Sequence, residues 1–277
     1  MTGAELPAHS GAAAPVGPGP GADGSSDWDG IAPGDRGTSH ARWQAWFAGR
    51  APDPVLDLPA GLRRLVVVAP HPDDEILGVG VTAARAAAAG VEVVIVAVTD
   101  GDASHPDSPT LDPRQLAALR IAESRRACAV LGLPEPVRLG LPDGGVHAHQ
   151  DQLARAIAAV VGGGSADCLV LCTWRGDGHP DHEASGRAAA AACAATGARL
   201  AEYPVWTWHW AEPGQERVPW DRRHRVVLSD AELAAKQAAV AEFVTQVAPL
   251  SSQPGDEAIL PDWILDRLVT REETVFW

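Results

Sequence analysis

The feature that most constrains this chain is a regular alternation of short apolar runs with longer segments of helical composition. Leu65–Ala69, Glu92–Val98 and Cys168–Thr173 are short and almost wholly apolar, which is typical of strands buried on both faces of a sheet. Between them lie helix-length segments such as Glu75–Ala89 and Pro113–Leu131, each followed by a glycine. Parallel strands need crossovers of this length. The pattern therefore predicts an α/β fold with three layers and a doubly wound, mainly parallel, Rossmann-like sheet.

The same alternation continues towards the C-terminus. We expect further strands at 136–141, 199–206 and 223–228, and further helices at 149–161, 183–196 and 230–247. A short helix at 41–49 is expected to lay its aromatic side chains on the domain. Residues 1–40 are rich in Gly, Ala and Pro and bury too little surface to offset the entropy of ordering, so we expect a disordered tail there and one domain over 41–277.

Charge and cysteine content exclude several classes of protein. The net charge is −14, from 36 acidic and 22 basic residues, which argues against binding nucleic acid or an anionic membrane surface. No stretch reaches the roughly 18 apolar residues of a membrane span, and no basic, apolar leader opens the chain. The four cysteines form no CxxC pair and are typical of buried side chains in a reducing compartment. We therefore expect a cytoplasmic protein.

Two similar polar motifs follow two of the predicted strands. Residues 70–75 read PHPDDE after the first strand, and residues 178–183 read GHPDHE after the fourth. A third His-Pro-Asp sequence begins at His105, in a loop rich in Ser, Asp and Pro, where we expect a surface residue. Ligands of such sheets bind outside the carboxyl ends of the strands, so the first two motifs are expected at the binding edge.

The proline in each motif indicates how its side chains are arranged. Proline suits the first position of a helix, so we expect His71 and His179 to be the capping residues. Asp74 and His182, three residues further on, would then lie on the same side of the helical turn. The two motifs together would direct these four side chains into one crevice.

Histidine and aspartate in this number favour a metal site. A catalytic zinc takes three N or O protein ligands and keeps one position open, and the motifs supply these with an imidazole and a carboxylate left for proton transfer. The competing interpretation is that the acidic residues only complement helix dipoles. That interpretation does not explain histidine at both capping positions, where Ser, Thr or Asp is favoured. Nor does it explain His182 at a helix start.

The two histidine motifs resemble those of the LmbE/PIG-L family of zinc-dependent N-deacetylases. Weaker similarity is carried by Val98–Asp102, Arg120–Gly132 and Leu139–Gly144, so that the resemblance extends over residues 62–272. It implies a single LmbE-like deacetylase domain within 41–277. The activity it implies is hydrolytic removal of an N-acetyl group from an N-acetylglucosamine-type sugar conjugate.

The resemblance also implies a role for each residue of the motifs. The implied Zn²⁺ ligands are His71, Asp74 and His182. Asp73 would be the general base for water at the metal, and His179 would polarise the carbonyl or protonate the leaving amine. Asp181 would orient His179. Some family members have a tyrosine just before the second motif, where this chain has Asp177 and Gly178.

Further residues are candidates for substrate contacts. Asp143, at the end of a predicted strand, suits a sugar hydroxyl, and Arg120 suits an anionic or hydroxyl-rich substrate. Trp208 and His209 follow the fifth strand, where an indole could stack on a sugar ring; the alternative for both is ordinary packing. The GxG at residues 78–80 lies beyond the helix start and lacks a third glycine. It therefore indicates close helix–sheet packing rather than a nucleotide site.

Two other functions remain alternatives at this point. The same site could hydrolyse a non-sugar amide conjugate, or the chain could be a non-catalytic metal-binding module. Asp73 argues against the module, because a closed structural site needs no general base. The expected partner is a small-molecule sugar conjugate, with no nucleic acid and no membrane span. A homo-oligomer and the metal used in the cell are left open.

Overall fold

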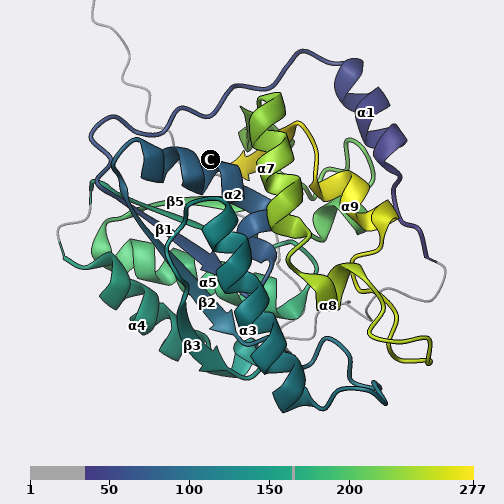
Figure 1. Ribbon diagram of the computed structural model, residues 1–277. Coiled ribbons are helices and arrows are strands. Elements are labelled where there is room, and N and C mark those ends of the chain that lie inside the picture. The colour runs from purple at the N-terminus through teal and green to yellow at the C-terminus, as the bar shows by residue number, and fades with distance from the viewer. Residues whose placement is uncertain (1–34, 164–165) are drawn as a thin grey trace, which may run out of the picture.

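A seven-stranded sheet forms the centre of the protein in the computed structural model, which describes residues 35–163 and 166–277 (Figure 1). The strands are β1 (Arg64–Ala69), β2 (Glu92–Thr99), β3 (Val137–Leu141), β4 (Cys168–Thr173), β5 (Arg199–Tyr203), β6 (Arg223–Val227) and β7 (Glu272–Phe276). The helices are α1 (His40–Ala48), α2 (Asp74–Ala88), α3 (Pro113–Val130), α4 (Gln150–Val161), α5 (Pro180–Thr196), α6 (Thr207–Trp210), α7 (Asp230–Val240), α8 (Val244–Val247) and α9 (Asp262–Leu268). Short 3₁₀ turns lie at Val146–His149 and Trp220–Arg222.

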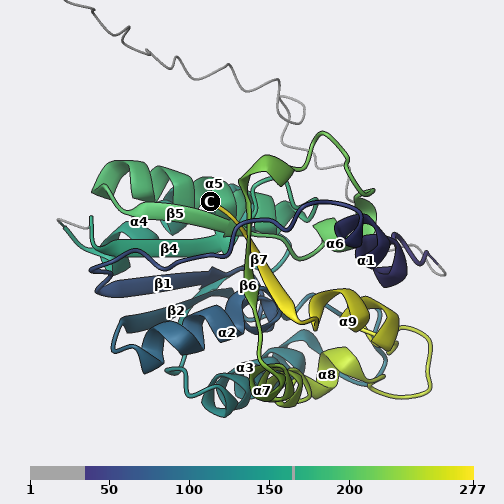
Figure 2. The same ribbon diagram turned by 90° about the horizontal axis from the view of Figure 1, so that it is seen from above.

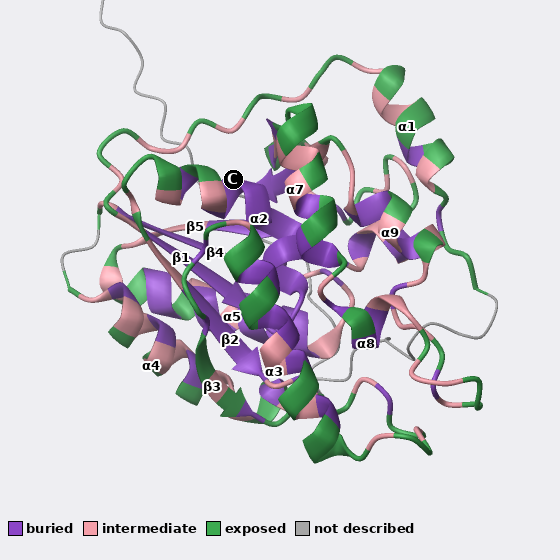
Figure 3. Cartoon of the chain, viewed as in Figure 1, coloured by how far each residue is buried: buried purple, intermediate pink, exposed green. Residues whose placement is uncertain are grey.

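The sheet is covered by helices on both faces, as the sequence predicted. Figure 2 shows α4 and α5 on one face and α2, α3 and α7 on the other. Strands β1 and β4 are buried along nearly their whole length, and the purple centre of Figure 3 lies along the sheet and α2. The predicted three-layer α/β fold is confirmed. The uniformly apolar strands are explained by the two helical layers that exclude water from them.

The order of the strands places a crevice between β1 and β4. The sheet runs β3-β2-β1-β4-β5-β7-β6, so the chain moves outward from β1 in one direction and then returns to β4 on its other side. β1 pairs in parallel with both β2 and β4. The connections that follow the adjacent strands β1 and β4 therefore run in opposite directions. In such sheets ligands bind at the carboxyl ends of these two strands.

The C-terminal part departs from the predicted pattern. β7 is antiparallel to both β5 and β6 and lies between them, and it was not predicted because it is short and begins with two glutamates. The expected helix 230–247 divides into α7 and α8, because Phe243 leaves the helical path to become fully buried in the core. The expected strand 199–206 ends at Tyr203, and α9 was also not predicted.

The structure describes only the last part of the predicted disordered tail, residues 1–40. Residues 1–34 of the predicted tail lie outside the described residues. Residues 35–40 pack on the domain, where the Thr38 hydroxyl donates to the Ala211 carbonyl at 2.7 Å. These six residues of the expected tail therefore lie against the domain. Helix α1 is present as predicted, and Trp43 is buried and donates through its indole N–H to the Trp208 carbonyl at 2.9 Å.

The four cysteines are free and buried, as expected. Within 35–163 and 166–277, no helix has the length and hydrophobicity that crossing a bilayer requires.

Candidate metal centre

Three potential metal ligands meet at the carboxyl ends of β1 and β4. His71 Nδ1 lies 3.2 Å from His182 Nε2 and 3.3 Å from Asp74 Oδ2. The third edge, from His182 Nε2 to Asp74 Oδ2, is 3.2 Å. Zinc bonds of 2.0–2.1 Å in tetrahedral geometry place neighbouring ligand atoms about 3.3 Å apart. The spacing of these three donors therefore fits a divalent cation bound on one side of the triangle.

Two carboxylates orient the histidines of this triangle. His182 Nδ1 lies 2.8 Å from Asp177 Oδ2, and His71 Nε2 lies 3.2 Å from Asp143 Oδ1. A metal-ligating histidine commonly donates its second N–H to a carboxylate, which selects the nitrogen that faces the metal. These contacts with Asp177 and Asp143 leave Nδ1 of His71 and Nε2 of His182 to face the metal. The same two nitrogens are the ones that lie 3.2–3.3 Å from each other and from Asp74 Oδ2.

Asp177 was not assigned a role from the sequence. Its carboxylate also accepts from the backbone N–H groups of Val205, Trp206 and Thr207, so the loop after β4 is tied to the segment after β5. The available signal was its place five residues before His182, in the loop that follows a buried strand. These backbone partners come from a distant part of the chain, which the sequence pattern does not reveal.

The two motifs do not begin their helices in the same way. His179 caps α5, with Pro180 in the first turn, as predicted. The expectation that His71 caps α2 was wrong, because Asp73 occupies the position before that helix. The Asp74 carboxylate accepts from the backbone N–H of His71 at 2.9 Å, and Asp73 N–H donates to Glu75 at 3.0 Å. These side-chain contacts stabilise a tight turn in place of a first helical turn.

Asp73 occupies an unusual and buried position in that turn. Its φ of 147° is the single positive value among the described non-glycine residues, a strain of the kind that collects at functional sites. Arg120, itself buried, donates to Asp73 Oδ2 at 2.9 Å and to the Pro72 carbonyl at 3.0 Å. Burial raises the pKa of Asp73 to about 7, although Arg120 opposes this shift.

The cluster around His71 and His182 has a strongly negative environment. Burial opposes protonation of His182, yet Asp74 and Asp177 raise its pKa to about 9. His71 shows the same balance, since burial lowers its pKa but Asp143, Asp181 and Asp74 together raise it well above its ordinary value. The carboxylates thus attract positive charge to the imidazoles, and a bound cation would replace those protons.

His179 stands beside the triangle. Its ring centroid is 4.8 Å from that of His71 and 4.9 Å from that of His182, and Nδ1 accepts from the backbone N–H of Asp181 at 3.2 Å. Burial and the neighbouring imidazoles lower the pKa of His179 well below its ordinary value. A neutral His179 with Nδ1 engaged carries its proton on Nε2.

Two of the predicted carboxylates contact His71. The Asp181 carboxylate, expected to orient His179, accepts from the backbone N–H groups of Gly144 and Val146 and lies 3.5 Å from His71 Nε2. Asp143, expected to bind a sugar hydroxyl, instead faces His71 and accepts from Ala103 N–H at 2.8 Å. The two carboxylates and His71 form a second group with ligand-like spacing, but it uses the nitrogen that faces away from His182.

The other substrate candidates occupy packed positions. Arg120, only 3% exposed, lies behind Asp73 rather than at an open surface. Trp208 packs edge-to-face on Trp43 at 5.2 Å between ring centroids. His209 Nδ1 contacts Arg267 at 2.8 Å. His105 is buried and faces the Glu257 carbonyl at 3.1 Å, which contradicts its expected surface position.

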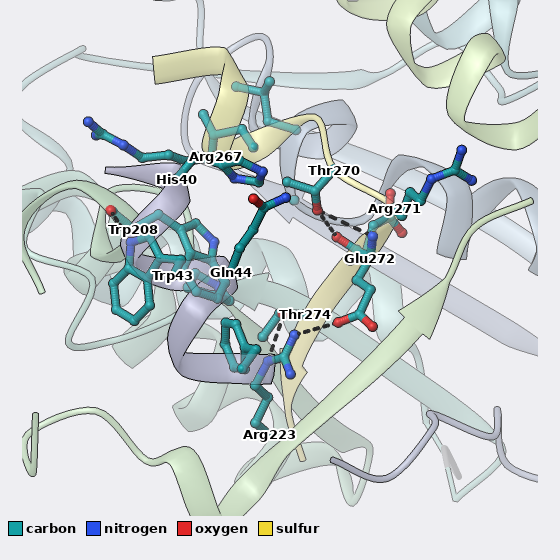
Figure 4. A pocket seen from close by; sticks show the side chains of 16 residues that line it. His40, Trp43, Gln44, Trp208, Arg223, Arg267, Thr270, Arg271, Glu272 and Thr274 are labelled. Atoms are coloured by element: carbon teal, nitrogen blue, oxygen red, sulfur yellow. Dashed lines mark hydrogen bonds and ion pairs between the residues drawn. The ribbon is translucent and has the colours of Figure 1, made fainter. Parts of the chain in front are cut away.

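A separate cavity of about 330 Å³ lies between α1 and β7 (Figure 4). No member of the His–Asp cluster lines it. Among its lining residues, Arg223 donates to Thr274 Oγ1 at 3.1 Å and to Glu272 Oε2 at 3.0 Å. Leu77 and Gly78 of α2 form part of its wall. Because the chemistry of the histidine motifs lies elsewhere, this cavity is not the candidate reaction site.

The fold and the cluster define an α/β protein with a candidate divalent-metal site at its topological switch point. The PIG-L family model, described as GlcNAc-PI de-N-acetylase, matches residues 66–193. A 1D-myo-inositol 2-acetamido-2-deoxy-alpha-D-glucopyranoside deacetylase of Streptomyces avermitilis is 31% identical over 235 residues, covering 74% of this chain and 77% of that protein. The Thermobifida fusca deacetylase of the same name is 27% identical, covering 78% and 79%. This chain belongs to the PIG-L family, whose members are N-deacetylases and hence amidohydrolases.

Solved structures agree on the fold. The A40926 pseudoaglycone deacetylase superposes with a TM-score of 0.56 at 23% identity, covering 77% of this chain and 96% of that chain. The zinc-inhibited form of teicoplanin deacetylase gives a TM-score of 0.55 at 22% identity, covering 76% and 96%. The LmbE-like fold expected from the sequence is confirmed.

Proposed function

We propose that this protein is a zinc-dependent hydrolase that removes an N-acetyl group from an N-acetylglucosaminyl conjugate. The observation that carries the proposal is the triangle formed by His71 Nδ1, Asp74 Oδ2 and His182 Nε2, with edges of 3.2–3.3 Å. Two neutral imidazoles and one carboxylate suit Zn²⁺ and leave a coordination position open. The family membership supports the reaction, and the names of the Thermobifida fusca and Streptomyces avermitilis relatives support a GlcNAc–inositol conjugate as the substrate class.

The proposed ligands are those three side chains, and the proposed domain is residues 41–277. When bound there, the cation would lower the pKa of water and polarise the acetyl carbonyl. Asp73, adjacent in sequence to Asp74, accepts a proton from the attacking water. Arg120 holds that carboxylate in place through the 2.9 Å contact.

His179 stabilises the negative charge that develops on the acetyl oxygen. Its ring lies beside both histidine ligands, and its Nδ1 is occupied by a backbone N–H, so Nε2 is the nitrogen that donates a hydrogen bond to that oxygen. As the amide C–N bond breaks, Asp73 gives the proton that it took from the water to the amine nitrogen. The carbonyl carbon keeps the water oxygen, and the second proton of the water is released to solvent when the acetic acid product ionises to acetate.

The direct test is acetate release from the purified, zinc-loaded protein. The substrates would be the GlcNAc–inositol conjugate, diacetylchitobiose and an N-acetyl peptide. We expect the sugar conjugates to be hydrolysed, and Asp73→Asn to reduce the rate by about 10²–10⁴-fold with the zinc content unchanged. Asp107→Asn, in an exposed loop, is the matched control.

Each outcome of this experiment decides something. Full activity of Asp73→Asn would refute the assignment of the base. Hydrolysis of the N-acetyl peptide alone would move the substrate class to non-sugar amides. Failure of the wild-type protein to retain a divalent metal would overturn the enzyme proposal and leave the site without its cation.

A further inference from the structure

Helix α2, which carries the proposed ligand Asp74 in its first turn, is broken in the middle. Val79 has φ −143° and ψ 23°, values outside the helical region, so the helix consists of two segments. In an unbroken helix the N–H of Val81 would donate to the carbonyl of Leu77, four residues earlier. A break of this kind frees backbone groups that need other partners when they are buried.

A buried ion pair occupies the break. Lys236 Nζ, from α7, donates to the Leu77 carbonyl at 2.8 Å and to Glu273 Oε1 at 2.9 Å. Glu273, from β7, accepts from Val81 N–H at 2.9 Å. The pair is thus inserted between the Leu77 carbonyl and the Val81 N–H, in place of the helical hydrogen bond.

The same carboxylate caps the second segment of α2. Glu273 Oε2 accepts from the backbone N–H of Thr82 at 2.8 Å and from its hydroxyl at 2.7 Å. Lys236 has no exposed surface and Glu273 is 2% exposed. Both residues are therefore fixed by these contacts. Their buried charges are matched by each other and by backbone dipoles.

The break has a packing cause next to the metal-binding turn. A Cβ on Gly78 would lie 2.2 Å from Tyr203 Cδ2, so the first segment approaches β5 more closely than any side chain at 78 would permit. Tyr203 is itself anchored, because its hydroxyl donates to the Val68 carbonyl at 2.8 Å. Leu77, Gly78 and Glu273 also border the cavity between α1 and β7.

We propose that Lys236 and Glu273 are positioning residues that hold the metal-binding turn of α2 in place. Their hydrogen bonds are to each other and to Leu77, Val81 and Thr82 of α2, and none of these residues is a proposed ligand. Lys236 and Glu273 fix the end of the short segment Asp74–Gly78, and thereby the distance of Asp74 from His182, which lies on the opposite side of the crevice. This inference rests on the proposed metal site.

The test uses the full-length protein and Co²⁺ as the probe, with affinity and visible absorption as readouts. We expect Lys236→Met to weaken Co²⁺ binding by about tenfold or more, as loss of supporting contacts around a metal does elsewhere. It should also change the Co²⁺ spectrum, which reports ligand geometry. Lys236→Met/Glu273→Gln removes both buried charges and should regain thermal stability without regaining the affinity, because the Leu77 carbonyl still lacks its donor.

The matched control is Glu123→Gln. Glu123 is also buried and accepts from the backbone N–H of Thr245 at 2.9 Å and from its hydroxyl at 2.7 Å, but it joins α3 to α8. We expect this variant to lose thermal stability and to keep the wild-type Co²⁺ affinity and spectrum. It thus separates a general loss of stability from a displaced turn.

The outcomes separate this inference from the proposed function. The positioning role would be overturned if folded Lys236→Met bound Co²⁺ as tightly as the wild type. It would also be overturned if the double variant regained both its thermal stability and its Co²⁺ affinity. If Lys236→Met does not fold, the double variant alone decides. Wild-type protein that binds Co²⁺ but releases no acetate, once zinc-loaded, would refute the deacetylase function and leave the titrations valid.

Discussion

Arg120 Nη2 donates to Asp73 Oδ2 at 2.9 Å, and both side chains are buried beside the proposed metal ligands. The guanidinium also donates to the carbonyls of Gly101 and Pro72, so it links the turns that follow β1 and β2. An arginine with these contacts positions the carboxylate and compensates its charge. It has little freedom to contact substrate.

Replacement of Arg120 by methionine should therefore impair catalysis more than metal binding. We expect kcat to fall by about tenfold or more, with KM and zinc content nearly unchanged, because Asp73 loses its orientation while the three ligands remain. Arg125→Met is the control, since Arg125 lies on the same helix but pairs with Glu135 at the surface. A large rise in KM with unchanged kcat would instead restore the original expectation that Arg120 binds substrate.

Asp177→Asn should weaken metal binding. The amide would present an N–H₂ group where the carboxylate now accepts from His182 Nδ1 and from the backbone, so one donor must lose its acceptor. We expect metal affinity to fall by about 10–100-fold, measured by competition with a chelator. Asp100→Asn, which breaks a surface contact with Arg138, should leave it unchanged. Equal effects of both substitutions would contradict the role of Asp177.

Gly78→Ala should destabilise the fold and the site together. The added methyl would meet the Tyr203 ring at 2.2 Å, and relief requires movement of α2 or β5. A loss of about 1–3 kcal/mol in the free energy of unfolding is expected for such overpacking. Gly49→Ala is the control, because its Cβ would make only ordinary contacts at 3.5 Å and its φ is −84°. Denaturant unfolding of both variants measures the difference.

The Arg85–Glu232 ion pair predicts a dependence of stability on pH. Hydrogen bonds from Arg85 and Ser229 lower the pKa of Glu232 to about 2 from its ordinary 4.5. A folded-state pKa below the unfolded one means that the stabilisation is present above about pH 4.5 and is lost as the pH falls towards 2. Glu232→Gln should cost at most about 1 kcal/mol at neutral pH, since the pair is partly solvated.

Thermal unfolding midpoints of the wild type and of Glu232→Gln at about pH 7, 5 and 3 check this sign. The gap between them should shrink at the lowest pH. A gap that widens on acidification would show that the carboxylate is not the stabilising form.

The sequence alone predicted those elements that depend on a local pattern of apolar residues or on a proline at a helix start. The buried strands β1, β2 and β4 follow from short apolar runs, and His179 at the start of α5 follows from its proline. The meeting of the two motifs follows from the rule that parallel strands place their carboxyl ends at one edge. These features need no knowledge of distant partners.

The remaining features of the site depend on particular side-chain contacts, some local and some between distant parts of the chain. The turn at Asp73 replaces an expected helix start because Asp74 and Glu75 bind backbone N–H groups of the preceding residues. Asp143 is engaged by His71, although a strand-end carboxylate alone suggests an open hydroxyl site. Neither apolar periodicity nor motif spacing contains this information.

The antiparallel strand β7 has a consequence for the order of events during translation. Glu273 of β7 accepts from the backbone N–H of Val81, which precedes it by 192 residues. The ribosome therefore releases both histidine motifs well before β7, the strand whose Glu273 stabilises the break in α2. A nascent chain can then display its histidines and aspartates while the turn between them is still unfixed. On the proposed role of Glu273, the mature metal affinity is acquired late, when β7 enters the sheet between β5 and β6.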